Sequence, residues 1–315
     1  MGGAAYAAAI DPFYSRNQNP FVQIYGLPVA ESGFITRPGE VRAVVFADVS
    51  NNFSDTTLSS ERVLIDGETT RLTALLRYGL FESLELGIDI PMISHNGGAS
   101  DSFISNFHKL FGFPAAGRDL VARDQIHYLY AANGVNGVNI QQSSIGLGDI
   151  QLSGAYQIWQ DQDSRSLALR AGLKLPTGNA GKLHGSGGTD ISLRLVYSDT
   201  KTFAAQNVTV FGALGGLIPG SGKVMQDVQR QYVTFGSFGL GWQACKRVSL
   251  KVQLDGHTPF YNSSLDELGT ISAQLVMGGS ISLFGKTYLD LAVSEDVIVN
   301  TAPDVVFHLA LRTTF

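Results

Sequence analysis

The last eleven residues, Val305 to Phe315, read VVFHLALRTTF and alternate in character. Successive side chains of a β-strand point to opposite faces of its sheet. One face of this strand would carry Val305, Phe307, Leu309, Leu311, Thr313 and Phe315. The other face would carry Val306, His308, Ala310, Arg312 and Thr314. The stretch therefore predicts a strand with one apolar face and one mixed face that includes charged groups.

The same alternation recurs along the chain from residue 40 and predicts twelve strands. Short turns are expected at 80–83, 160–164, 198–202, 245–247 and 284–286. Longer loops are expected at 52–60, 94–145, 176–188, 219–229, 259–267 and 295–304. An even number of antiparallel strands, joined alternately by short turns and long loops, is typical of membrane-spanning barrels. We therefore predict an all-β fold, a transmembrane antiparallel up-and-down β-barrel of about 12 strands.

The composition is compatible with this fold. Charged residues make up 16% of the 315 residues, against roughly 25% in typical soluble proteins. The formal net charge of −5 gives no footprint for nucleic acid. The single cysteine, Cys245, excludes an intrachain disulfide and a cysteine-based zinc cage. Apolar runs all stay below the roughly 18–20 residues of a membrane helix, which counts little against a barrel because its strands give weaker signals.

The charged residues of the predicted strands fall on the face opposite the leucines and valines. Backbone polar groups in hydrocarbon must be hydrogen-bonded, and a closed barrel satisfies them with strands. An Arg or Lys on the lipid face near mid-bilayer would cost about 2–4 kcal/mol. The predicted lumen-facing residues are therefore Arg42, Asp48, Arg71, Arg77, Glu85, Asp89, Arg170, Lys174, Asp190, Arg194, Lys251, Asp255, His257, Asp290 and Arg312. These charged groups have two possible roles. They could fill the lumen as ion pairs, or they could line an aqueous path through it.

The segment before the strands has two parts. Residues 1–9 end in Ala7-Ala8-Ala9, which has the small-residue form of a signal-peptidase site, so we expect a signal-peptide remnant there. Residues 10–39 contain Pro12, Pro20, Pro28 and Pro38, and these prolines exclude a central strand or a helix. Several aromatic residues accompany them. The segment is expected to be either a plug inside the barrel, which begins at residue 40 and runs to 315, or a periplasmic strap.

The insert at 94–145 contains a helical pattern. Phe103, Phe107, Leu110 and Phe111 follow the spacing i, i+4, i+7 and i+8, which predicts a short helix with one apolar stripe. A structureless loop of this length would be uncommon in a compact domain. We therefore expect one long, partly helical extracellular loop, whose four apolar residues are candidates for a gate at the barrel mouth.

Motifs for chemistry are weak. The glycine-lysine sequences at 178–182 and 220–223 lack the first glycine and the Ser or Thr of a phosphate loop. The histidines show no metal-ligand spacing, so no metal or cofactor is expected. Asp255 and His257 share a lumen-facing side, and a nearby Ser could complete a hydrolase triad. Because this pair points away from lipid, the chain is predicted not to be an enzyme.

Several motifs carry a family resemblance over most of residues 17–315. Gly148-Asp149-Ile150, Leu175-Pro176-Thr177-Gly178 and Gly185 to Asp190 resemble outer-membrane proteins described as meta-pathway phenol-degradation-like. Asn19-Pro20 and Gly26-Leu27-Pro28, with the stretch 107–114, are similar to a proteobacterial family of unknown function in the same barrel group. The terminal Phe315 resembles the signal read by the outer-membrane assembly machinery.

The resemblance implies a protein of the Gram-negative outer membrane, with membrane lipid and the assembly machinery as partners. The even number of strands predicts that both termini are periplasmic. The resemblance also implies passive uptake of small molecules, and a small apolar molecule is a candidate ligand. A nucleic acid partner is not expected. A sealed structural or interaction barrel is the alternative, and a lipid-modifying enzyme is a weaker one. The sequence makes no prediction about the oligomeric state.

Overall fold

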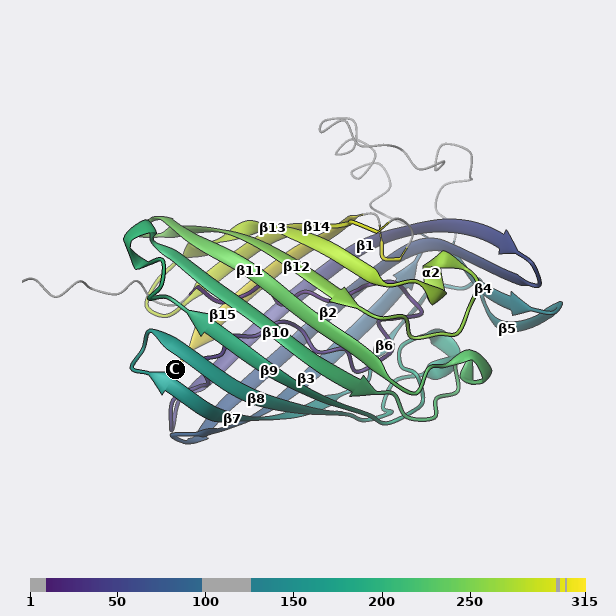
Figure 1. Ribbon diagram of the computed structural model, residues 1–315. Coiled ribbons are helices and arrows are strands. Elements are labelled where there is room, and N and C mark those ends of the chain that lie inside the picture. Colours follow the sequence, from purple (N-terminus) through teal and green to yellow (C-terminus); the bar gives the residue numbers. More distant parts are fainter. Residues whose placement is uncertain (1–9, 98–125, 299–300, 304) are drawn as a thin grey trace, which may run out of the picture.

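The strands of the computed structural model wind at a tilt around a closed barrel (Figure 1). The structure describes residues 10–97, 126–298, 301–303 and 305–315. Within these ranges, fifteen strands form one sheet, and twelve of them make up the wall. The wall closes because β15 pairs with β14 on one side and with β1 on the other, both antiparallel. This confirms the predicted antiparallel barrel and its strand number.

The wall strands have the following bounds: β1 (Val41–Leu58), β2 (Glu61–Phe81), β3 (Leu84–Asn96), β7 (Gln151–Asp161), β8 (Arg165–Lys174), β9 (Asp190–Asp199), β10 (Val208–Ile218), β11 (Val233–Cys245), β12 (Val248–His257), β13 (Ser272–Ser282), β14 (Tyr288–Asp296) and β15 (Val305–Thr314). Three shorter strands are β4 (His127–Ala132), β5 (Val135–Ile140) and β6 (Ser144–Leu147). The described helices are single turns: η2 (Ala180–Lys182), η3 (Ala204–Gln206), η4 (Gln226–Val228) and α2 (Asp266–Gly269). Within the described ranges, no helix has the length and apolar character needed to cross a membrane.

The two faces of the wall separate apolar from charged side chains. On β15, Leu309 and Leu311 are each 48% exposed and point outward, whereas His308 and Arg312 are buried and point inward. On β2, buried and exposed residues likewise alternate over much of the strand, with Leu72 and Leu76 outward and Arg71 and Arg77 inward. The wall is therefore an apolar surface around a polar interior.

The two ends of the barrel differ in their connections. We call the short-turn end the one with the connections at 82–83, 162–164, 200–207, 246–247 and 283–287. β1 starts and β15 finishes at this end, since Val41 exchanges backbone hydrogen bonds with Phe315. The opposite end, which we call the long-loop end, carries the connections after β3, β8, β10, β12 and β14. The β1–β2 hairpin also turns there and extends beyond the other strands of the wall (Figure 1).

The predicted loop at 52–60 is wrong. β1 continues to Leu58 and β2 begins at Glu61, with Leu58 opposite Glu61, so only two residues form the turn. The extension is rich in Ser, Thr, Asn and Asp. An apolar stripe with period two arises only where one strand face meets lipid or a core, so this polar extension gave no such signal.

The predicted lack of strands across 94–145 is also wrong in the described part of that insert. β4 and β5 form a hairpin that pairs with the extension of β2, and β6 pairs with β3. The turn between β4 and β5 consists of Asn133 and Gly134, which both have positive φ, as a two-residue hairpin requires. The gate candidates Phe103, Phe107, Leu110 and Phe111 lie outside the described residues.

The outward face gives a test of the membrane-spanning wall. Leu309 faces outward midway along β15, opposite Ala47 and Leu291. Leu309→Arg should lower the free energy of unfolding by about 2–4 kcal/mol, because the charge must enter hydrocarbon. Urea titrations of the protein in lipid vesicles measure this change. Thr57→Arg, at an exposed position in the β1 extension, is the control and should change stability by roughly 0–1 kcal/mol. Equal effects of the two substitutions would contradict a lipid-facing β15.

Candidate functional site: the plugged lumen

The lumen is occupied by residues 10–36, which we call the plug. Apart from Pro28, Phe34 and Ile35, every residue of the plug is buried. The plug enters at the short-turn end, where Asp11 lies beside Arg312. It reaches the long-loop end near Phe21, whose carbonyl accepts a hydrogen bond from Tyr261. It then returns to the short-turn end, where Gly39 donates its backbone N–H to the Gly79 carbonyl. The chain thus makes a U-turn inside the barrel before β1 begins.

The centre of the plug is held by Glu31. Its carboxylate lies 2.9 Å from Arg77 Nε, 3.5 Å from Arg170 Nη1 and 2.6 Å from Arg194 Nη2. Two carboxylates of the wall complete the network, since Arg77 pairs with Asp89 and Arg170 with Glu85, each at 2.6 Å. All six groups are buried. Three cations therefore face three anions, and one of the anions belongs to the plug.

A second ionic cluster lies toward the short-turn end. Arg312 Nη1 contacts Asp11 of the plug at 2.6 Å, and Arg312 Nε lies 3.4 Å from Asp290. Lys251 Nζ contacts Asp290 at 3.3 Å and donates a hydrogen bond to the Asp11 carbonyl. The same ammonium lies 3.9 Å from the ring centre of Phe13. This cluster fixes the entering arm of the plug to β12, β14 and β15.

A third cluster holds the plug near the long-loop end. Lys174 Nζ lies 2.7 Å from Asp149 and 3.0 Å from Asp190, and donates to the carbonyl of Ile24 at 3.0 Å. Asp190 in turn accepts from the backbone N–H of Gly26. A Cβ at Gly26 would come within 3.2 Å of both side chains that flank it, so glycine lets the plug backbone approach the wall.

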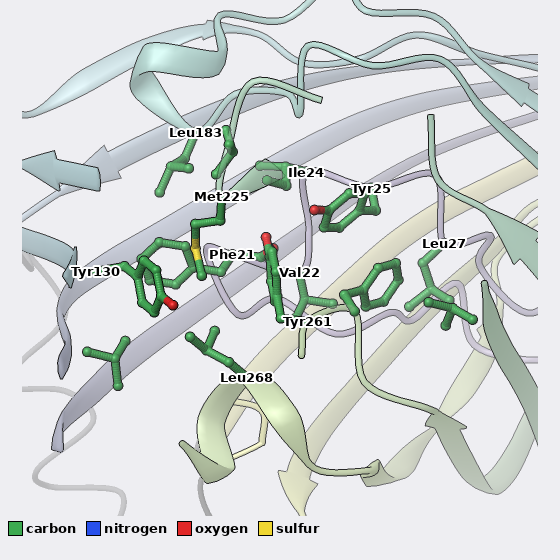
Figure 2. Packing of buried hydrophobic residues seen from close by; sticks show 14 of the residues in the cluster. Phe21, Val22, Ile24, Tyr25, Leu27, Tyr130, Leu183, Met225, Tyr261 and Leu268 are labelled. Atoms are coloured by element: carbon green, nitrogen blue, oxygen red, sulfur yellow. The ribbon is translucent and has the colours of Figure 1, made fainter. Parts of the chain in front are cut away.

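An aromatic cluster surrounds the bend of the plug (Figure 2). Tyr25 stacks on Phe260 with 4.6 Å between ring centres, and Tyr261 meets Tyr25 edge to face. Phe21 and Leu27 of the plug join the same apolar cluster, to which the loops at the long-loop end contribute Leu183 and Met225. The bend is therefore packed against loops, while the two arms are bound to the wall by polar groups.

At the long-loop end, His95 of β3 stacks on His184 of the loop after β8, with 5.5 Å between ring centres. His184 Nε2 also lies 3.0 Å from Ser144 Oγ. Partial burial lowers the pKa of His184, and the positive charge of Lys182 lowers it further. His184 is therefore neutral at pH 7 and serves in packing. In the described ranges, no group of three His, Cys, Asp or Glu side chains could hold a metal ion.

The remaining sequence-predicted residues also lie on the lumen side. Arg71 donates to the carbonyl of Gln23, and Asp255 accepts from Ser15 of the plug and from Gln253. His257 does not contact Asp255. Its Nε2 lies 3.0 Å from Asn17 of the plug and its Nδ1 lies 2.9 Å from the Thr258 carbonyl. The triad considered from the sequence is thus not assembled around His257.

The described residues form a large hollow at the short-turn end. This vestibule has a volume of about 720 Å³ and is lined by residues that include Ile35, Arg42, Glu82, Gln160 and Tyr288. Two smaller cavities lie between the plug and the wall, with volumes of about 30 Å³ and about 20 Å³. Since one water molecule needs about 10–15 Å³, each of these two cavities has room for only one or two water-sized molecules or ions.

The sequence analysis found wall residues and missed their partners in the plug. Asp11, Arg16 and Glu31 are the charged residues of the plug, and Asp149 binds Lys174 from the break between β6 and β7. A signal for Glu31 existed, because an acidic residue in a largely apolar, proline-rich segment needs a buried partner if that segment is enclosed. Which three arginines pair with Glu31 depends on how deep the plug lies in the barrel, and no sequence pattern predicts this depth.

Comparisons with known proteins agree with the barrel. The COG4313 outer membrane channel from Pseudomonas putida F1 matches with a TM-score of 0.57 and 14% identity, over 89% of this chain and 97% of that one. The KdgM porin matches with a TM-score of 0.45 and 7% identity, over 87% and 99% of the two chains. The Pseudomonas putida toluene transporter TodX matches with a TM-score of 0.38 and 11% identity, over 97% and 94%. The first comparison shows a shared fold, and the other two scores are too low to carry an argument.

The sequence comparisons give a family without a function. A family model described as "Protein of unknown function (DUF3187)" matches residues 3–315. No curated protein sequence matches the chain.

The shared carboxylate of Glu31 gives a second test. Glu31→Gln keeps the shape but leaves three buried arginines with two carboxylates, so the free energy of unfolding should fall by about 3–5 kcal/mol. Glu40→Gln removes a partner of exposed Lys286 and should cost only about 0–1 kcal/mol. Urea titration compares the variants, and limited trypsin digestion at Arg16 reports whether the plug loosens. Equal stability of both variants would show that the central network does not hold the plug.

Proposed function

Because the chain belongs to the DUF3187 family of proteins of unknown function, we propose its function from the structure. The protein is a plugged outer-membrane barrel that admits small molecules, hydrophobic ones among them, by passive diffusion when the plug shifts. Three features support this proposal: the outer surface, the separate plug and the vestibule.

The outer surface supports a place in a membrane. Outward side chains such as Leu195, Leu250 and Leu291 are 47–49% exposed, and they belong to strands all around the wall. Soluble monomers rarely expose an apolar patch of more than a few hundred Å². Lipid solvates such a belt, and closed barrels with short turns at one end are the outer-membrane type.

The observation that carries this proposal is that the lumen is filled by a segment separate from the wall strands. An eight-stranded barrel can be filled by its own side chains, whereas twelve strands enclose more space. Here the plug fills that space, and both of its ends lie at the short-turn end. At each of the three ionic clusters, the plug is bound to the wall by contacts in which at least one of the two groups is a side chain. Such contacts can be exchanged for water without opening the strand pairing of the barrel.

The vestibule supports small solutes. Its volume of about 720 Å³ lies within the roughly 300–1,000 Å³ of small-molecule sites. At the other end, the aromatic cluster around Tyr25 and Phe260 offers an apolar surface. The similar structure from Pseudomonas putida is an outer membrane channel, which fits the passage of small solutes. That hydrophobic molecules are among them is inferred from the sequence resemblance to the meta-pathway group.

A sealed structural barrel is the second candidate, and the packing of the plug favours it. The cavities between plug and wall measure only about 30 Å³ and about 20 Å³. A solute of several heavy atoms cannot pass through them while the plug is docked.

Conductance separates the two candidates. In planar bilayers, the wild type should open rarely, and Glu31→Gln should raise the open fraction at least several-fold because the plug loses its central anchor. Arg62→Gln, at the exposed ion pair with Asp55 at the long-loop end, should behave like the wild type. Swelling of proteoliposomes in arabinose gives a second reading of the same opening. If a variant without residues 10–36 inserts as a barrel and still conducts no ions, the transport proposal is wrong and the sealed barrel stands.

Orientation is a separate proposal, in which the short-turn end faces the periplasm. Cys245 is exposed at that end, so a membrane-impermeant thiol reagent should label it only after the cells are opened. In a Cys245→Ser background, Thr57→Cys at the long-loop end should be labelled on intact cells. Labelling of Cys245 from outside would invert this orientation and would leave the conductance proposal untouched.

A further inference from the structure

Arg16, on the entering arm of the plug, is a buried cation without a bonded partner. Its side chain is 3% exposed. Its Nε, Nη1 and Nη2 atoms have no hydrogen-bond partner among the described residues, and none of those residues forms an ion pair with it. Arg194, which lines the same small cavity, is instead paired with Glu31 at 2.6 Å. Arg16 thus differs from Arg194 and from the other arginines of the central network, which are paired with carboxylates.

Such an arrangement is unfavourable unless something further binds. A guanidinium group keeps its proton under all ordinary conditions, so Arg16 cannot relieve its burial by becoming neutral. An enclosed charge without a partner is among the costliest features a folded protein can hold. A ligand that accepts hydrogen bonds from the Arg16 guanidinium would offset this cost.

The cavity beside Arg16 shows what chemistry is missing. It has a volume of about 30 Å³, and its lining includes Arg16, Gln274 and Asp255. The unpartnered buried atoms of its lining residues are the three guanidinium nitrogens and Gln274 Nε2, which are all N–H donors. Asp255 is the carboxylate of the lining, and its oxygens accept from Gln253 and Ser15. Four N–H donors without a partner, three of them on a permanent cation, favour an anion, which only accepts hydrogen bonds, over water, which also donates them.

The charges around the cavity point the same way. Arg71 is 2% exposed, its Nε has no partner among the described residues, and it lies close enough to Arg16 for the two cations to repel. The carboxylates that act on Arg16 are engaged elsewhere. Asp48 lies 2.5 Å from His308, and Asp89 lies 2.6 Å from Arg77. Arg16 and Arg71 are thus two neighbouring cations for which the described residues form no ion pair, and Asp255 is the carboxylate of the cavity lining nearest to offset them.

We propose that this cavity binds a halide-sized monovalent anion such as chloride, held by the guanidinium of Arg16 and the side-chain amide of Gln274. A volume of about 30 Å³ accommodates about two water-sized probes, so a monatomic ion fits and sulfate or gluconate does not. Gln274 belongs to β13, so the anion joins the plug to the wall. The site does not depend on the proposed transport function, because it would also stabilise a sealed barrel.

Bromide provides a direct test on the full-length protein. Crystals soaked in sodium bromide should show an anomalous scattering peak within hydrogen-bonding distance of Arg16 and Gln274 Nε2. Crystals of Arg16→Met should lack it. A wild-type cavity that holds only water, without a bromide peak, would overturn the proposal.

Thermal unfolding in detergent gives an independent test. The midpoint for the wild type should be higher in sodium chloride than in sodium gluconate of equal ionic strength, with a saturable dependence on chloride, because a ligand of the folded state raises its stability. Arg16→Met should abolish the difference. Arg62→Met, at an exposed ion pair with Asp55, is the control and should retain it.

A second variant covers the case in which Arg16→Met does not fold. Gln274→Met leaves the plug intact and should raise the chloride concentration at half-maximal shift several-fold. If chloride shifts the wild type and Gln274→Met at the same concentrations, or shifts Arg16→Met as much as the wild type, the anion is not bound in this cavity and the proposal is wrong.

Discussion

The pairing of β1 with β15 is the interaction on which the rest of the structure depends. Ten residue pairs, from Arg42 opposite Thr314 to Asn51 opposite Val305, join the first and last strands of the wall. Without this seam the sheet would have two edges whose backbone groups face hydrocarbon, where each unpaired group costs several kcal/mol. Closure removes those edges and divides space into an outer lipid surface and an enclosed lumen. The side chains of each wall strand then alternate between the lipid surface and the lumen.

Closure also creates the problem that the plug solves. Twelve strands surround more space than their own side chains fill, and the charged residues excluded from the lipid surface all project into it. Left without partners, these residues would attract water and keep the lumen open. The plug supplies backbone carbonyls, N–H groups and two carboxylates at matching depths. Its apolar residues cluster at the bend, where the loops at the long-loop end cover them. The same segment therefore neutralises the wall and carries an apolar cap.

The sequence was informative wherever one strand face meets lipid. Leu309 and His308 alternate because their surroundings differ, so both the strand and its orientation could be predicted from residue types alone. Beyond the membrane that contrast disappears, which is why the continuation of β1 to Leu58 was missed. The inward direction of Arg77 and Arg170 followed from the cost of charge in lipid. Their common partner Glu31 did not, because the sequence separation of 46 and 139 residues is bridged only when the plug settles at one depth in the barrel. Short sequence patterns therefore predict which strand face a side chain lies on, whereas its partner depends on how deep the plug lies in the barrel.

The charge balance of the central network limits how the plug can move. With the plug docked, Arg77, Arg170 and Arg194 face Glu31 and the wall carboxylates Glu85 and Asp89, three against three. If Glu31 withdraws, three cations remain with two carboxylates, and the lumen acquires a positive charge in a region of low dielectric constant. That charge attracts the carboxylate back, so an opened barrel would tend to close again without any external energy. Full removal of the plug is for the same reason less favourable than a partial shift, in which water enters along one arm while Glu31 keeps some of its partners.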